Sequence, residues 1–357
     1  MITKPLTEDS LKDAKGLVCE RFGKGAIALL EHSMQNPMRK YCADAGDVVY
    51  DDDGTPICFQ ASMLRQVYFG QTEARGSVGG MTCLKVGGPV EAMIEIRAAS
   101  NKSRGGSVWG FGNSLNEHSA AITRKLKTRH AGPESCSRYL WRAIRPIECG
   151  LYFVRRKLLK GSMPKWKSFS TLKSLSWMEE LGGMKIKRIS QPGQDFFDVL
   201  MARYLRTNEG LVCSRTAEEI NWIFGDRMRN GEVVVLGAFD AEGPVGYILL
   251  RGDLFAKRWR IHDWFAVGNR ADELETLLGS ACRFLKSQTH AMMLEVEGFP
   301  TWVQPMLKKY LPHVREVGFN QFSWGSRDKE FKAKVMPIID SPKSWFFGPY
   351  DGDECMS

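Results

Sequence analysis

Hydrophobic and polar positions change period once within residues 259–288, and this change predicts a strand, a short loop and a helix in that order. Over 259–267 apolar and polar residues alternate, which is the pattern of a half-buried strand. Over 274–285 apolar residues recur at spacings of three and four, which is the pattern of one helical face. The break between the two periods is short, so the first turn of the helix follows the strand closely.

The loop at this break combines features that favour an anion with features that oppose one. Asn269 follows Gly268 and can cap the helix, and Asp272 three residues later suits a capping box. Arg270 and the free N–H groups of the first helical turn could face a phosphate. Asp272 and Glu273 already satisfy the helix dipole with negative charge, and we favour ordinary capping over a phosphate site.

The same reasoning along the whole chain predicts one order of elements twice. In the first half we expect strands at 2–6, 48–50, 56–68, 79–86 and 107–112, with helices at 9–22, 26–34, 90–99 and 116–126. In the second half we expect strands at 184–190, 232–239, 244–251, 259–267, 291–296 and 316–324, with helices at 196–205, 217–228, 271–288 and 301–311. The repeated order indicates that one fold is used twice.

Two predicted hairpins support this repeat. DVVYDDDGTPICFQASML and VVVLGAFDAEGPVGYILL each place an acidic turn ending in glycine between two strands, with a proline close behind. We therefore expect an N-terminal domain at 1–150, a basic connecting segment at 151–180, a C-terminal domain at 181–335 and a tail at 336–357. Trp345, Phe346 and Phe347 in the tail predict that it packs against the body of the protein.

Composition limits the class of protein. A chain of 357 residues with 43% hydrophobic content can form two cores. No apolar run is long enough for a membrane span, and residues 1–16 lack the hydrophobic segment of a signal peptide, which favours a cytoplasmic protein. The nine cysteines include no CxxC pair, and the six histidines include no HxH or HExxH spacing. We therefore expect neither a disulfide framework nor a metal site.

The net charge of +9 is unevenly distributed. From 151 to 178 there is no Asp or Glu, whereas the segment contains seven basic residues, namely Arg155, Arg156, Lys157, Lys160, Lys165, Lys167 and Lys173. Such a segment could contact nucleic acid or an acidic surface. We favour a solvated interdomain connection, because a phosphate-contact patch has no reliable sequence signature.

The repeated order of strands and helices resembles the GNAT acyltransferase superfamily. The resemblance covers nearly the whole chain as two copies and rests on the hairpins, on the long strand followed by a loop and helix, and on the run Asn113-Ser114-Leu115-Asn116-Glu117-His118. It implies an α+β fold of two tandem GNAT-like domains, each with a mixed, mostly antiparallel sheet flanked by helices. It also implies acetyl-CoA or another acyl-CoA as co-substrate.

In the family the loop after the fourth strand holds the CoA pyrophosphate with the pattern Arg/Gln-x-x-Gly-x-Gly/Ala, and both loops of this chain depart from that pattern. The resemblance gives cofactor-binding candidates in the first loop at Val86, Gly87, Gly88, Val90 and Glu91, with Asn116 beyond it, and in the second loop at Gly268, Asn269 and Arg270. Two glycines allow the backbone to approach a phosphate, although Pro89 removes one donor. We therefore place the cofactor in the first half.

Acyl transfer to an amine needs a base, a donor near the thioester oxygen and an acid for the leaving thiolate. In this fold the site lies where the fourth and fifth strands splay apart, so the catalytic candidates are Asn113, Asp263 and Glu295. For each we favour a structural role, such as an ion pair with Arg260. His118 and His262 lie in the same regions, and Tyr139 and Tyr204 are general-acid candidates by residue type alone.

Three functions follow from this sequence. The first is an N-acyltransferase that passes an acyl group from acyl-CoA to a small-molecule or peptide amine bound between the domains. The second is a Fem-type aminoacyl transferase, distantly similar in its tandem copies, whose donor would be charged tRNA; nucleic acid is not the favoured partner, because no helical arm is evident. The third is a non-catalytic binding protein with degenerate cofactor loops. The sequence does not distinguish oligomeric states.

Overall fold

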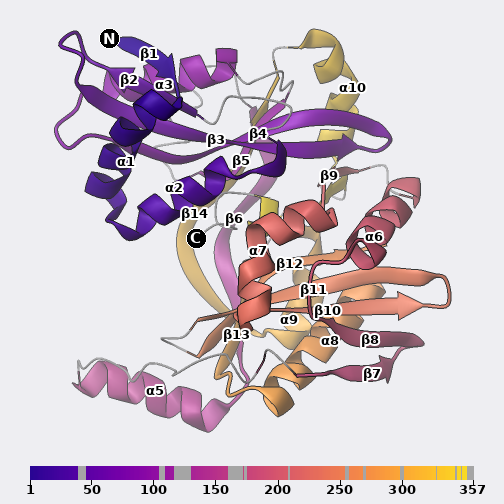
Figure 1. Ribbon diagram of the computed structural model, residues 1–357. Coiled ribbons are helices and arrows are strands. Elements are labelled where there is room, and N and C mark those ends of the chain that lie inside the picture. The colour runs from indigo at the N-terminus through magenta and orange to yellow at the C-terminus, as the bar shows by residue number, and fades with distance from the viewer. Residues whose placement is uncertain are drawn as a thin grey trace. The chain divides into compact units, whose positions relative to one another are not determined.

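The computed structural model describes residues 1–38, 46–103, 109–115, 130–159, 172, 175–207, 210–253, 257–267, 271–297, 301–326, 328–341, 344–346 and 348–351. The chain forms helices and strands in the order shown in Figure 1. It divides into two compact units. Unit 1 comprises residues 1–135, 209–214 and 319–357, and unit 2 comprises residues 136–208 and 215–318.

This division differs from the boundaries expected from the sequence. Residues 136–150 belong to unit 2, and the last part of the chain from Phe319 belongs to unit 1. The reason is that two long strands, β6 (His130–Ala143) and β14 (His313–Gly325), each begin in one unit and end in the other. The basic segment is not a plain connection, because α5 (Pro146–Leu159) occupies its beginning and β7 (Met178–Leu181) its end.

Unit 1 follows the predicted order of the first half as far as β5, and the predicted helix at 116–126 lies outside the described residues. Its elements are β1 (Ile2–Pro5), α1 (Glu8–Phe22), α2 (Gly25–Met34), β2 (Gly46–Tyr50), β3 (Pro56–Phe69), β4 (Thr72–Leu84), α3 (Val90–Ser103) and β5 (Trp109–Leu115), joined by β9 (Leu211–Cys213), α10 (Lys329–Ile339) and β15 (Trp345–Phe346). The sheet runs β1-β2-β3-β4-β5-β14. Adjacent strands in this order are antiparallel, except for β4 and β5, which are parallel.

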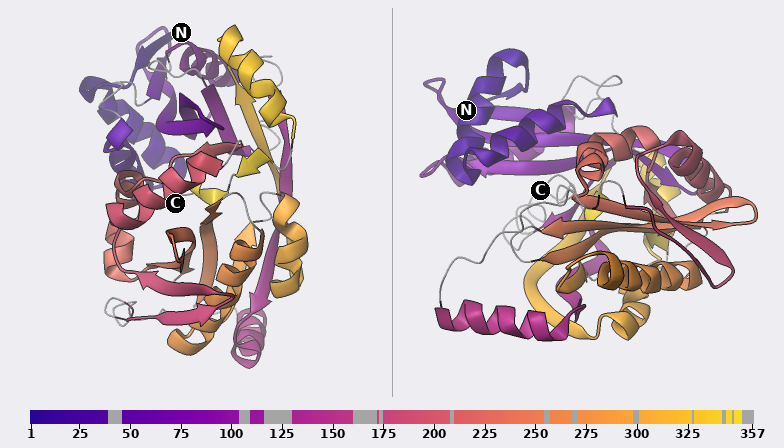
Figure 2. Two further views of the ribbon diagram at one scale, coloured as in Figure 1. Left: turned by 90° about the vertical axis from the view of Figure 1, so that its right-hand side faces the viewer. Right: turned by 60° about the horizontal axis from the view of Figure 1, so that its bottom comes forward.

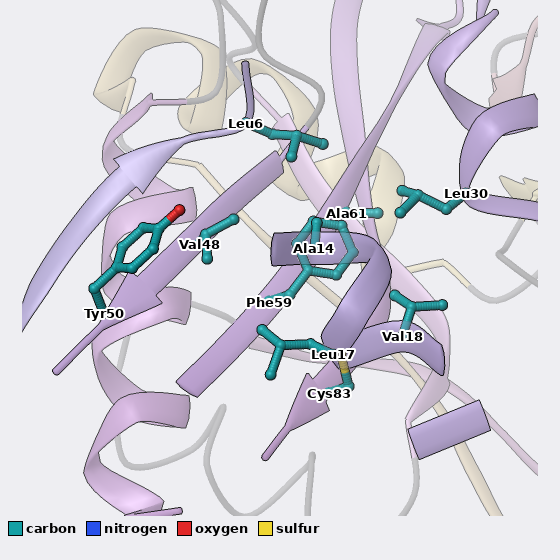
Figure 3. Close-up of a cluster of buried hydrophobic side chains, with 10 residues drawn as sticks. All are labelled: Leu6, Ala14, Leu17, Val18, Leu30, Val48, Tyr50, Phe59, Ala61 and Cys83. Atoms are coloured by element: carbon teal, nitrogen blue, oxygen red, sulfur yellow. The ribbon is translucent and has the colours of Figure 1, made fainter. Parts of the chain in front are cut away.

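Alternation along β2 and β3 divides the core of unit 1 between two faces of the sheet. Val48 and Phe59 pack with the buried residues of α1, including Ala14, on one face (Figure 3). Val49, Cys58 and their neighbours pack with Ala92 and Ile96 of α3. The apolar positions of α1 and α3 are thus buried, as their spacing predicted.

The last part of the chain completes unit 1. β15 pairs in parallel with β9, and β9 pairs antiparallel with the end of β3. Tyr350 is fully buried: its carbonyl accepts a hydrogen bond from Arg65 (3.2 Å), its ring lies 4.4 Å from that guanidinium, and its hydroxyl donates to the Ser214 carbonyl (2.9 Å). The predicted packing of the tail is therefore present.

Unit 2 repeats the order. Its further elements are β8 (Met184–Ile189), α6 (Gln194–Thr207), α7 (Ala217–Asn230), β10 (Val233–Asp240), β11 (Gly243–Asp253), β12 (Arg258–Ala266), α8 (Ala271–Gln288), β13 (Met293–Glu297) and α9 (Gln304–Tyr310). The sheet runs β6-β13-β12-β11-β10-β8-β7, and among the described strand pairs of this sheet only β12 with β13 is parallel. Helices α6 and α7 lie on one face and α8 on the other (Figures 1 and 2). The predicted α+β class, with a mixed, mostly antiparallel sheet flanked by helices in each unit, is confirmed.

Candidate functional site

In unit 1 the parallel strands β4 and β5 pair along only a short stretch. Their register runs from Gly76 opposite Trp109 to Val78 opposite Phe111. Beyond this point β5 pairs with β14 on its other side, while β4 continues along β3 to Leu84. Among the described pairs, the end of β4 therefore has a strand partner on one side only, namely β3.

A bulge shapes the same end of β4. The register between β3 and β4 shifts between Phe59 and Ala61, and Met81 has a φ of 47°, a left-handed conformation rare for a residue with a side chain. Gln60 is buried here, and its amide lies where a Cβ on Gly79 would stand. A side chain at position 79 would thus collide with Gln60, which explains the glycine.

The loop from β4 to α3 presents a backbone donor that already contacts an anionic oxygen. The Val86 N–H donates to the Glu20 carboxylate of α1 over 2.9 Å. Gly87 has a φ of 76°, and the Gly88 N–H donates to the Lys85 carbonyl over 2.9 Å, which closes the turn before α3. The side chains of Val86 and Val90 are 74% and 60% exposed, so the loop faces solvent. Such a turn at a helix start is suited to an anion.

The thiols below this loop do not provide a nucleophile. Burial raises the pKa of both Cys58 and Cys83 to about 12. A thiol is reactive as its thiolate, and these two stay protonated at neutral pH. Any acyl transfer at this end of β4 would therefore proceed without a covalent intermediate on either of them.

Unit 2 repeats the splayed strands and the bulge. β12 and β13 pair from Arg258 opposite Met293 to Ile261 opposite Val296. The register between β11 and β12 shifts between Leu249 and Leu250, and it leaves His262 as the extra residue of the bulge. The second loop, with Gly268, Asn269 and Arg270, lies outside the described residues.

Solved structures with the same fold are found across the chain. A GCN5-related N-acetyltransferase from Anabaena variabilis superimposes with a TM-score of 0.55 at 10% identity, over 90% of this chain and 72% of that one. N-myristoyltransferase from Saccharomyces cerevisiae with bound myristoyl-CoA gives a TM-score of 0.53 at 11% identity, over 91% and 82%. A GCN5-related N-acetyltransferase from Kribbella flavida gives 0.52 at 12% identity, over 90% and 71%.

The chain has the GNAT fold. No protein-family model and no curated protein matches its sequence. At these identities the likeness establishes the fold alone, so the roles of individual residues rest on the geometry within each unit. The predicted resemblance to the GNAT superfamily is confirmed at this level, whereas the Fem similarity and a common origin of the two halves stay predictions.

Asp263, a predicted catalytic residue in the second GNAT-like sheet, is held in a buried ion pair. Its two oxygens accept from Nε and Nη2 of Arg215 at 2.9 and 3.1 Å, and Tyr247 donates a third hydrogen bond to it. The Asp263 and Arg215 side chains are both 1% exposed, and the guanidinium also lies over the Phe265 ring. These contacts support a structural role, because a base must reach its substrate.

Glu295, the second candidate there, is surrounded by arginines. Its carboxylate contacts Arg260 and lies 3.5 Å from both Arg258 and Arg315, and its side chain is 2% exposed. The predicted pairing with Arg260 is therefore present. The ring of Tyr139, a general-acid candidate, lies beside the guanidinium groups of Arg260 and Arg315, at 5.3 and 5.0 Å.

The remaining candidates fall into three groups. Tyr204 is fully buried and packs against Phe265 with ring centroids 4.3 Å apart. Asn113 lies in β5, with only its backbone described, while Asn116 and His118 lie outside the described residues. The candidates Val86, Gly87, Gly88, Val90 and Glu91 come together in the first loop and the start of α3.

His262 is a neutral imidazole at physiological pH. Burial, and then the positive charges of Arg251, Arg260 and Arg227, lower its pKa to about 3. Its Nδ1 has no hydrogen-bond partner, and its ring contacts Phe224 edge to face. An imidazole with this pKa is a weak base, which argues against proton abstraction by His262.

Glu20 and Arg215 are not among the candidates predicted from the sequence. Each contacts its partner across a long separation in the chain, 66 residues for Glu20 with Val86 and 48 for Arg215 with Asp263. Both residues have ordinary surroundings in the sequence. Only the fold brings them to the loop and to the bulged strand. Among the residues that the structure covers, no group of His, Cys, Asp or Glu is arranged to hold a metal ion, and no helix is long and apolar enough to cross a membrane.

Proposed function

We propose that the protein is an N-acyltransferase that takes its acyl group from acyl-CoA, and that unit 1 holds the donor. The observation that carries this proposal is the first loop, which follows a splayed and bulged strand and directs the Val86 N–H at a carboxylate oxygen. A pyrophosphate oxygen, like a carboxylate oxygen, accepts a hydrogen bond from a backbone N–H. Similarity to structures described as N-acetyltransferases and as an N-myristoyltransferase with bound myristoyl-CoA supports the choice of donor.

The loop residues fit a CoA pyrophosphate in four respects. The Val86 donor is on the surface, where a ligand can replace the Glu20 carboxylate. Gly87 adopts its left-handed conformation without a Cβ penalty. A Cβ at Gly88 would lie 3.0 Å from the Lys85 carbonyl oxygen, so glycine keeps this turn tight. The start of α3 at Val90 then adds its partial positive charge.

The proposed reaction joins the donor to a small-molecule or peptide amine. The thioester of acyl-CoA supplies the activated carbonyl. Attack by the amine forms the C–N bond and breaks the C–S bond, and the amine proton must leave while the thiolate gains one. In this proposal the loop of unit 1 binds and orients the donor, whereas the buried ion pair of Asp263 in unit 2 maintains its sheet.

Binding of the donor can be tested at the exposed start of α3. Val90→Asp places a negative charge where the pyrophosphate would lie, and the helix dipole tolerates that charge. We expect isothermal titration calorimetry with acetyl-CoA and myristoyl-CoA to show binding by the wild type and about a fivefold to tenfold weaker affinity for Val90→Asp. Val90→Asn is the matched neutral control and should bind as the wild type does.

Two results would contradict the proposal. If the wild type shows no heat of binding with any acyl-CoA, acyl-CoA is excluded as the acyl donor. Equal affinity of Val90→Asp and Val90→Asn would exclude this loop as its site. Release of free CoA thiol in the presence of amines, and of peptides with a free α-amino group, would then identify the acceptor class.

A further inference from the structure

Helix α5 exposes its apolar side chains instead of burying them. Ile147, Leu151, Val154 and Leu158 are 81%, 62%, 53% and 73% exposed. Cys149 is buried, with only 4% of its surface exposed. A helix of a globular protein normally turns its apolar face to the core. In unit 2 this helix lies apart from the helices that cover the sheet (Figures 1 and 2).

These four aliphatic residues form one stripe. Successive residues of an α-helix are turned by about 100°, so the spacings of four, three and four from Ile147 to Leu158 keep all four side chains within an arc of about 60°. Cys149 falls on nearly the opposite side of the helix. Phe153, which is 45% exposed, lies outside this arc, and Cys149 is the buried residue among the described side chains of the helix. Four neighbouring exposed aliphatic side chains form a contiguous apolar patch, whereas a single exposed leucine would not.

Basic residues border this stripe on both sides. By the same helical geometry Arg155 and Lys157 lie on opposite flanks of it, roughly 70–90° from its centre, and both are exposed. The acidic residue of the helix, Glu148, lies in its first turn, on the same flank as Arg155, and the flank with Lys157 carries no acidic residue. From 151 to 178 the sequence has seven basic residues and no acidic one. An aliphatic stripe with cationic flanks complements a surface that is apolar within and negatively charged at its boundary.

We propose that α5 docks in the plane of an anionic lipid surface, with Ile147, Leu151, Val154 and Leu158 in the acyl region and Arg155 and Lys157 at the headgroups. The cationic side chains have long aliphatic stems that can follow the stripe inward while the charges stay with the lipid phosphates. The helix has 14 residues, about 21 Å in length, which suits docking along the surface and is too short for a span. The proposal does not depend on the acyltransferase function.

Vesicle binding tests this proposal on the full chain. We expect the wild type to float with phosphatidylcholine vesicles that contain about 30% phosphatidylserine, and to bind pure phosphatidylcholine at least about tenfold less, because the charge contribution is then lost. The double variant Leu151→Gln/Leu158→Gln should bind the anionic vesicles about tenfold or more weakly, since affinity scales with the apolar area buried. Raising the salt to about 0.5 M should weaken the wild type.

A matched control removes exposed apolar residues elsewhere. Val199 and Val314 are 42% and 44% exposed, and Val199→Gln/Val314→Gln should bind vesicles as the wild type does. The proposal would be overturned by a wild type that binds neither vesicle, by equal binding to both, or by unchanged binding of the Leu151→Gln/Leu158→Gln variant. Sedimentation equilibrium gives a further test. If the wild type is a dimer and the Leu151→Gln/Leu158→Gln variant is a monomer, a second copy of the chain covers the stripe and the proposal is overturned.

Discussion

At the residue scale the contact between Glu20 and Val86 determines how readily the first loop accepts an anion. The carboxylate occupies the backbone donor and repels a phosphate that approaches it. Glu20→Gln keeps the shape of the side chain and removes its charge. We expect this variant to bind acetyl-CoA about fivefold more tightly than the wild type by calorimetry.

The control for Glu20 lies on the neighbouring helix of the same unit. Glu31 pairs with Lys15 at 2.6 Å on the surface, so Glu31→Gln removes an equal charge away from the loop. Its affinity for acetyl-CoA should stay within about twofold of the wild type. An affinity of Glu20→Gln no higher than that of Glu31→Gln would show that Glu20 does not compete with the ligand.

His262 predicts a pH dependence of stability. Its pKa is about 3 in the folded chain and about 6.5 when unfolded, so the unfolded state binds the extra proton between these values. Above about pH 6.5 the imidazole is neutral in both states, and the folded state keeps its full stability. Below about pH 6.5 protonation of the unfolded state favours unfolding, so the free energy of unfolding decreases as the pH falls. Between pH 7 and pH 5 we expect this one residue to lower the free energy of unfolding by about 2 kcal/mol.

Urea unfolding at both pH values measures this effect. His262→Gln should lose about 2 kcal/mol less than the wild type over the interval, because the variant has no imidazole to protonate. His290→Gln, at an exposed position, should lose as much as the wild type. An equal loss of unfolding free energy between pH 7 and pH 5 in the wild type and in His262→Gln would contradict the assignment of the pH dependence to His262.

At the element scale the ion pair of Arg215 and Asp263 holds the residue before the N-cap of α7 against β12. Arg215 immediately precedes Thr216, whose side chain caps α7 by accepting from the Glu219 N–H at 3.4 Å. Asp263 lies beside the bulge of β12. The pair therefore joins the start of a helix to the bulged strand β12.

Breaking this pair should be costly. Asp263→Asn leaves the Arg215 guanidinium buried and uncompensated, and we expect the free energy of unfolding to fall by about 3–5 kcal/mol. Asp226→Asn breaks an exposed pair with Arg229 and should cost less than about 1 kcal/mol. Equal small losses in urea unfolding would contradict the structural role and return Asp263 to the catalytic candidates.

At the scale of the whole molecule unit 1 is assembled from three separate parts of the chain. β9 contributes the fully buried Leu211, Val212 and Cys213 beside the end of β3. The ring of Phe331 lies 5.2 Å from that of Phe69, and Tyr350 covers Arg65, which is 1% exposed. A first half taken from the linear sequence lacks all of these contacts.

A fragment of residues 1–150 therefore should not fold alone. Without β9 and residues 319–357 it exposes Phe69 and leaves the Arg65 guanidinium without its Tyr350 partner. We expect a two-dimensional amide NMR spectrum with poor dispersion and no cooperative unfolding transition. The full chain is the reference. A well-dispersed spectrum of the fragment would show that the linear division is an independent domain.

The sequence by itself determined what local spacing controls. Alternation along β12 and the spacing of three and four along α8 placed a strand and a helix close to where they lie. The alternation predicted a half-buried strand, whereas residues 261–266 are buried on both faces of the sheet. The repeated order with its two acidic turns determined the α+β class and led to the GNAT fold. The loop around Gly87 and Gly88 was likewise identified locally, since glycine marks a left-handed turn.

Only the tertiary structure decided which chain segments share a unit and which charges meet. No local pattern shows that Leu211–Cys213 and Tyr350 complete unit 1, because strand pairing between distant segments depends on the whole sheet. The pairing of Asp263 with Arg215 and of Glu20 with Val86 arises in the same way. A carboxylate has the same sequence signature whether it is a buried partner or a base, and its role follows from the groups that the fold places around it.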